Sequence, residues 1–229
     1  MKTIIGVWIV GFLLVLQTVN IVSACCEQES QAASTLNGDW QLTTVVDNSA
    51  FQETVMMSVR EPLLLVRSDK GYCALGIVGK KQDGYVLLWR YHTLRTTGVY
   101  KGSTRRDVCS QGGEDTEIVI AGSVSLTSET TRPIIGRFTA YKRTLLRVAV
   151  MPEGSGMVVS DTDAIACGDD CSEHYIGGCR RVTLTAVPAS GWIFQYWQIG
   201  DMFVQDNPLQ NLRISTDLNV CAVFSSTSD

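Results

Sequence analysis

The chain has few of the residues on which most enzymes and nucleic-acid-binding proteins depend. Of its 229 residues only two are histidines and 18% are charged, and acidic residues outnumber basic ones, which gives a formal net charge of −4. A nucleic-acid-binding surface needs a basic excess, so this balance argues against a nucleic-acid partner. The sequence also has no Gly-x-Ser-x-Gly nucleophile motif and no glycine-rich phosphate loop.

Long apolar runs are also missing from most of the chain. One run, from Ile4 to Leu16, follows the positive charge of Lys2 and is shorter than the ~20 residues that a membrane-spanning helix requires. The small residues Val22-Ser23-Ala24 end this segment in the way that a signal peptidase recognises. We therefore expect residues 1–24 to be a signal peptide and the rest of the chain to be exported.

The residues around the expected cleavage site resemble the lipobox of bacterial lipoproteins. The motif is Val22-Ser23-Ala24-Cys25, and the resemblance implies that acyl chains such as palmitate on Cys25 anchor the protein to the membrane of the cell envelope. The polar stretch from Gln17 to Asn20 fits an alternative, which is ordinary cleavage and release into the periplasm or the medium. Residues 25–35 are mostly small and polar, which predicts a flexible tether.

Eight cysteines constrain the exported part. An oxidising compartment makes disulfides the default state of cysteines. Cys25 and Cys26 lie at the expected mature N-terminus, which leaves an even set of six in the folded part. These six are Cys73, Cys109, Cys167, Cys171, Cys179 and Cys221. Because Cys73 and Cys109 are the only two in the first half, we expect a bridge between them.

From Leu36 onward, short runs rich in β-branched and aromatic residues alternate with turn residues. Asp69-Lys70-Gly71 and Asp83-Gly84 are turn signals, and no segment of this half keeps a 3.6-residue apolar period. The pattern predicts a small antiparallel barrel or sandwich over residues 36–144. The predicted strands are residues 40–46, 54–59, 63–67, 72–78, 85–91, 117–126 and 134–142.

The tripeptide Gly38-Asp39-Trp40, which opens the first predicted strand, is similar to the start of lipocalin-like barrels. This resemblance implies an alternative function, a carrier of a small ligand that uses the first half as a cup. Such a carrier would enclose an apolar cavity larger than about 300 Å³.

The second half, residues 145–225, resembles the B-repeat of internalin B-type bacterial surface proteins. The matching motifs are residues 146–150, 154–158, 165–172, 182–188, 191–194 with Trp197, and 218–224. After the tryptophan the family often has Gly-Gly-x-Cys, whereas this chain has Ile199-Gly200-Asp201-Met202. The resemblance implies a β-grasp-like, mainly β fold with one short helical or looped crossover. It also implies a Cys167–Cys171 bridge, and Cys179 would then pair with Cys221.

The residue pattern of the second half agrees with a mainly β fold. Residues 182–186 alternate between apolar residues and threonine, as in a half-buried strand. Phe194 and Trp197 are three positions apart, so a single helical turn would place both on the sheet. On that turn Trp192 and Tyr196 would face away from the sheet, and we expect them to form an interaction surface for an envelope protein or a glycan.

Two groups of residues in the second half have the chemistry of metal ligands. Three thiols and one imidazole suit zinc, but the oxidising compartment favours disulfides for the thiols. These four residues are Cys167, Cys171, His174 and Cys179. Four carboxylates lie nearby without EF-hand spacing, so we expect solvated loop acids and no calcium. They are Asp161, Asp163, Asp169 and Asp170. We predict no metal and no cofactor.

The expected function is that of a non-enzymatic binding or assembly module at the bacterial surface. A single repeat-like domain is a poor spacer, because long stalks need arrays of repeats. An alternative is a secreted enzyme, which would need a cleft where His92 or His174 meets a carboxylate or a nucleophile.

Overall fold

The computed structural model describes residues 35–93, 96–109, 115–128, 132–162 and 164–227. All regular secondary structure in these residues is β-strand, so the mainly β prediction is confirmed. Among the described residues, no helix is long and apolar enough to cross a membrane. The expected signal peptide, Cys25, Cys26 and the tether as far as residue 34 lie outside the described residues.

The strands form two compact units, and the units are not continuous in sequence. Unit 1 takes the chain up to Arg105 and then Ile120–Ala140, whereas unit 2 takes Arg106–Val119 and everything from Tyr141. The predicted boundary between residues 144 and 145 lies close to the last change of unit, between Ala140 and Tyr141. The predicted first domain, however, also contained Arg106–Val119, which packs within unit 2.

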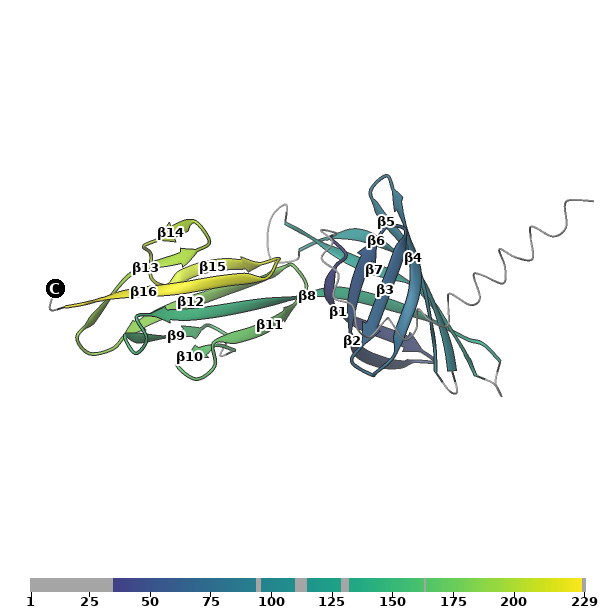
Figure 1. Cartoon of the computed structure of the whole chain (residues 1–229), viewed down its shortest axis with the longest axis horizontal. Helices are drawn as coiled ribbons and strands as arrows, with labels where there is room; N and C mark the ends of the chain where they lie inside the picture. The colour runs from purple at the N-terminus through teal and green to yellow at the C-terminus, as the bar shows by residue number, and fades with distance from the viewer. Residues whose placement is uncertain (1–34, 94–95, 110–114, 129–131, 163, 228–229) are drawn as a thin grey trace, which may run out of the picture. The chain divides into compact units, whose positions relative to one another are not determined.

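Unit 1 is an eight-stranded antiparallel barrel that closes through pairing of its first and last strands (Figure 1). The strands follow one another around the barrel in chain order, and the last three continue into unit 2. They are β1 (Gly38–Val46), β2 (Ser49–Arg60), β3 (Leu63–Ser68), β4 (Cys73–Lys81), β5 (Gly84–His92), β6 (Thr96–Val108), β7 (Thr116–Ser128) and β8 (Ile134–Met151).

Every strand of the barrel except β6 corresponds to a predicted one. The residues of β6 that face the interior are Gly98, Tyr100, Gly102 and Thr104, and all four are buried. Two glycines and a threonine do not produce the apolar alternation that identifies a half-buried strand, so the sequence pattern missed this one.

Aromatic side chains fill the barrel interior. Trp40 and Trp89 are fully buried, and Phe138 nearly so. The Trp89 ring stacks on Tyr100 with 4.9 Å between ring centroids, and Phe138 lies edge-on to both rings at 5.1 and 5.2 Å. The Trp40 indole donates a hydrogen bond of 2.9 Å to the carbonyl oxygen of Leu36. The centre of this barrel is therefore a packed core.

Unit 2 consists of two sheets that share one core. In the larger sheet β11 pairs with β8, and the order continues β8-β16-β13-β14; the smaller sheet has the order β10-β9-β12-β15. Both sheets contribute buried side chains to the core, including the fully buried Trp197. The strands are β9 (Gly156–Ser160), β10 (Ala166–Cys167), β11 (Ser172–Ile176), β12 (Arg180–Pro188), β13 (Trp192–Ile199), β14 (Met202–Val204), β15 (Leu209–Ile214) and β16 (Leu218–Ser226).

The segment that was expected to form a helical turn is the strand β13. In its pairing with β16 one residue, Gln195, has no partner between Phe194 and Tyr196 and forms a β-bulge. Because the bulge changes which side of the strand faces the core, Phe194 and Trp197 both pack there, with ring centroids 5.3 Å apart. The predicted core role of this pair is confirmed, and the predicted helical turn is wrong.

Candidate functional site

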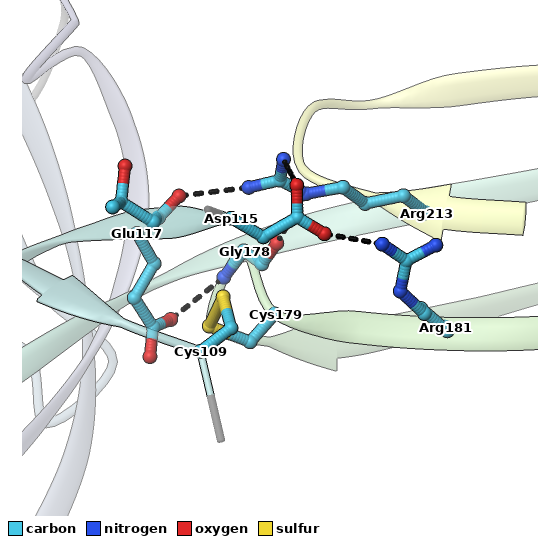
Figure 2. The surroundings of a disulfide bond; sticks show 8 residues. Cys109, Asp115, Glu117, Gly178, Cys179, Arg181 and Arg213 are labelled. Atoms are coloured by element: carbon cyan, nitrogen blue, oxygen red, sulfur yellow. Dashed lines mark hydrogen bonds and ion pairs between the residues drawn. A yellow bond between two sulfur atoms is a disulfide. The ribbon is translucent and has the colours of Figure 1, made fainter. Parts of the chain in front are cut away.

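Two disulfides lie in unit 2. The Cys167–Cys171 bridge implied by the resemblance is present. A second bridge joins Cys109 to Cys179, which are 70 positions apart in the sequence (Figure 2). Three of the four residues considered as zinc ligands are therefore in disulfides, as predicted for them. Two disulfides are consistent with an exported protein.

The two other expected pairings, Cys73 with Cys109 and Cys179 with Cys221, are wrong. The first was expected because Cys109 lies in the first half of the sequence, but the segment Arg106–Val119 belongs to unit 2 and brings Cys109 to Cys179. Cys221 lies on β16 in the larger sheet, whereas Cys179 directly precedes β12 in the smaller one. Cys221 forms no disulfide, and burial raises the pKa of its thiol.

A carboxylate beside the Cys109–Cys179 bridge holds two arginines (Figure 2). One oxygen of Asp115 accepts a hydrogen bond of 2.8 Å from Nη1 of Arg213, and the other oxygen pairs with Nη2 of Arg181. Arg213 also donates to the carbonyl oxygen of Gly178 at 3.1 Å, and the N–H of Gly178 donates to Glu117 at 2.8 Å. These contacts fasten the segment Arg106–Val119 to β12 and β15, which is a structural role.

The two aromatic residues that were expected to form an interaction surface lie on opposite faces of β13. Trp192 is half-buried and packs against the core of unit 2, so the outward orientation expected for it is wrong. Tyr196 follows the bulge and lies on the outer face, where its ring meets Phe203 of β14 edge-on with 5.3 Å between centroids. The predicted outward orientation therefore holds for Tyr196 alone, and its role in an interaction stays a prediction.

A groove of about 630 Å³ lies beside Tyr196 at the edge of the larger sheet. We call it the edge groove and define it by Tyr196, Phe203, Val204, Gln205 and Asp206. The loop that closes it is fixed by the indole of Trp197, which donates to the carbonyl oxygen of Asp206 at 3.1 Å. The groove combines two aromatic rings with a carboxylate and an amide, so it can contact an apolar group and hydrogen-bond a polar one at once.

Phe203 and its neighbour Met202 were not identified from the sequence, although a signal was present. Ile199 pairs with Met202 across a two-residue turn, Gly200-Asp201, in which Gly200 has a φ of +58°. A glycine followed by aspartate between apolar runs is typical of a hairpin turn. This hairpin carries the edge groove.

A polar cluster lies at one end of the barrel in unit 1. Glu53 lies opposite the buried Leu42 in the β1–β2 pairing, so its carboxylate faces inward. It accepts hydrogen bonds from the hydroxyl of Tyr72, at 2.9 Å, and from the hydroxyl of Ser68. The Tyr72 ring stacks on Tyr91 with 4.4 Å between centroids. The carboxylate is thus satisfied by hydroxyl donors of the barrel itself.

Both histidines considered as catalytic groups are exposed. Nδ1 of His92 lies 2.6 Å from the hydroxyl of Thr97, in an exposed position. His174 is also exposed. In the described part of the chain, no carboxylate contacts either imidazole.

Two of the four loop carboxylates considered for calcium accept hydrogen bonds from the backbone, and Asp169 is exposed. Asp161 accepts a hydrogen bond from the N–H of Thr183 at 3.1 Å, and Asp170 accepts one from the N–H of Ser172 at 3.4 Å. Asp163 lies outside the described residues. Within the described ranges, no three histidine, cysteine, aspartate or glutamate side chains form a group that could hold a metal ion.

The chain matches no protein-family model, and comparisons with curated proteins and with solved structures find no match either. The fold and the site define an all-β protein of two units, with two disulfides and an aromatic groove at a sheet edge.

Proposed function

We propose that the chain is a non-enzymatic binding protein of the bacterial cell envelope, anchored by lipid on Cys25, and that the edge groove of unit 2 holds its partner. The sequence supports the anchor through the signal segment and the lipobox-like motif. The two disulfides fit an oxidising compartment. The motifs of the second half resemble those of the internalin B-type repeat, which is known mainly as a spacer or interaction module in surface proteins.

One observation carries this proposal: an aromatic side chain of the groove is exposed on an edge strand. Phe203 is 63% exposed, although it is bulky and lies in a strand, and its ring contacts that of Tyr196. Grouped exposed apolar side chains mark interaction sites in soluble proteins. Because β14 ends the strand order of its sheet, its outer side offers unpaired backbone groups to which an extended partner segment can add as a strand.

The packing of unit 1 favours a binding module over a small-ligand carrier. A carrier needs an apolar cavity inside the barrel. In this barrel the rings of Trp40, Trp89, Tyr100 and Phe138 are buried in the interior and contact one another or neighbouring backbone.

A crosslinking experiment tests the groove. A photo-activated amino acid at position 203 of the envelope-bound protein should form one dominant adduct, and Tyr196→Ser should abolish that adduct. Removing one central aromatic residue from an interface commonly weakens binding by roughly 30-fold. Met157→Ser is the matched control, since Met157 is 41% exposed on the smaller sheet of the same unit. Equal adduct formation by the Tyr196 variant would exclude the groove as the binding site.

The anchor is tested separately with radioactive palmitate. Wild-type protein should be labelled and the Cys25→Ala variant should not. Failure to label the wild type would refute the anchor and leave the groove proposal intact.

A further inference from the structure

The outer face of three neighbouring barrel strands carries aliphatic side chains in register. Leu63 of β3 lies opposite Ile77 of β4, which in turn lies opposite Leu88 of β5. These three side chains are 60%, 55% and 38% exposed. Other aliphatic residues on the same outer face extend this row. We call the whole set the aliphatic patch: Leu63, Leu65, Leu75, Ile77, Val86 and Leu88.

Cations border the aliphatic patch. The cross-strand row of Leu63, Ile77 and Leu88 ends at Arg60 of β2 on one side and at Lys101 of β6 on the other. In the adjacent row, Arg90 of β5 lies opposite Leu75. None of these three cations forms an ion pair with another described residue. None of the side chains that point outward from β2–β6 within unit 1 is acidic, and the carboxylates of Glu61, Asp69 and Asp83 lie in the turns at the strand ends. A chain with a net negative charge thus has one face that is aliphatic with a cationic border.

We infer that this face of the barrel rests on the surface of an anionic lipid bilayer. The aliphatic patch would enter the boundary between headgroups and acyl chains, where its apolar surface is removed from contact with water. The bordering cations would meet the lipid phosphates, to which each lysine or arginine near the surface adds attraction. This inference uses the proposed lipid anchor for one step only, which is that the anchor places the barrel close to a bilayer.

The length of chain before the barrel supports this occupant. The first core residue of unit 1 is Leu36, which is fully buried. Residues 25–35 reach at most about 40 Å even when fully extended. A lipid on Cys25 would therefore hold the barrel within that distance of the bilayer, and the high local concentration would make a weak surface contact effective.

The charge pattern disfavours a second copy of the chain as the occupant. If two patches met about a two-fold axis, Arg60 of one copy would face Arg60 or Lys101 of the other. Like charges that meet across an interface are unfavourable. Anionic headgroups have the complementary charge.

Vesicle co-sedimentation tests the inference with the chain from Cys25 onward, produced without acyl chains. We expect binding to vesicles that contain phosphatidylglycerol, little binding to pure phosphatidylcholine vesicles, and weaker binding at high salt. Arg60→Gln and Lys101→Gln should each lower the partition coefficient by about five-fold. Ile77→Thr, which keeps a β-branched residue in the strand, should lower it several-fold.

The matched controls are Ile135→Thr and Arg137→Gln on β8 of the same barrel, because both side chains are exposed and lie outside the patch. They should leave vesicle binding unchanged, and far-ultraviolet circular dichroism should show that every variant is folded. Absence of binding to anionic vesicles, or equal losses in the controls, would overturn the inference. So would a dimer in sedimentation that Ile77→Thr dissociates. Because the chain carries no lipid, a failed palmitate label would remove the anchor without affecting this result.

Discussion

Asp115 is one carboxylate shared by two arginines, and it joins the segment Arg106–Val119 to the rest of unit 2. Asp115→Asn keeps the shape of the side chain but leaves Arg181 and Arg213 close together without a counter-charge. The three side chains are about one-quarter to one-third exposed, so solvent weakens the effect. We expect a loss of about 1–2 kcal/mol in the free energy of unfolding.

Urea unfolding of the wild type and the Asp115→Asn variant checks this value. Glu153→Gln is the control, because Glu153 is an exposed turn residue, and a surface change of this kind should cost less than about 0.5 kcal/mol. The deficit of the Asp115 variant should shrink at high salt. Equal stability of the two variants at low salt would show that the arginine pairs contribute nothing.

Three tyrosines inside the barrel predict a loss of stability at alkaline pH. Burial raises the pKa of Tyr72, Tyr91 and Tyr100, to about 12 for Tyr100, and the Glu53 carboxylate adds to the effect. An unfolded tyrosine ionises near pH 10. The fold therefore keeps protonated tyrosines that the unfolded chain would ionise, so their contribution is complete below pH 10 and is lost as the pH rises through about 12.

Spectroscopic titration of tyrosinate together with urea unfolding measures this dependence. Tyr100 alone should lower the free energy of unfolding of unit 1 by on the order of 2 kcal/mol between pH 10 and about pH 12, and Tyr100→Phe should remove this share of the fall. Ionisation of every tyrosine near pH 10 without unfolding would contradict the prediction.

At the scale of the element, the bulge at Gln195 decides which side chains of β13 face the core. Deleting Gln195 would leave Phe194 and Trp197 two positions apart in a regular strand, so both would still face the core. We therefore expect the deletion variant to keep cooperative unfolding of unit 2 and to lose less stability than Trp197→Ala, which should cost about 3–5 kcal/mol. Gln195→Thr keeps the bulge and should unfold nearly as the wild type does. A deletion variant that is less stable than Trp197→Ala in urea unfolding would show that the bulge itself is needed.

For the same strand, the sequence pattern predicted which residues are in the core but not the secondary structure that places them there. The spacing of Phe194 and Trp197 was enough to assign both to the core, because a helical turn and a bulged strand place residues three apart on the same side. It was not enough to choose between these two structures. The orientation of Trp192 was then wrong, because it depended on the choice. The edge groove was missed because β14 has only three residues, too few for an apolar alternation to be recognised.

At the scale of the whole molecule, the sequence predicted the number of units and their mainly β character but not the membership of Arg106–Val119. This segment runs from the end of β6 to the start of β7 in the sequence and contacts Arg181 and Arg213, which follow much later in the chain. Periodicity describes local structure and contains no information on such distant contacts. Assigning Cys109 to Cys73 by elimination failed for this reason.

The Cys109–Cys179 bridge should therefore matter more to the stability of unit 2 than the Cys167–Cys171 bridge. In the chain-entropy model, closing a loop of 70 residues stabilises the fold by about 4 kcal/mol, whereas a loop of 4 residues contributes about 2 kcal/mol. Replacing both cysteines of the long-range bridge by serine should lower the unfolding midpoint more than the same change in the short bridge. Non-reducing peptide mapping should first recover Cys109 linked to Cys179. Recovery of Cys109 linked to Cys73 would contradict both the placement of Arg106–Val119 and this ranking.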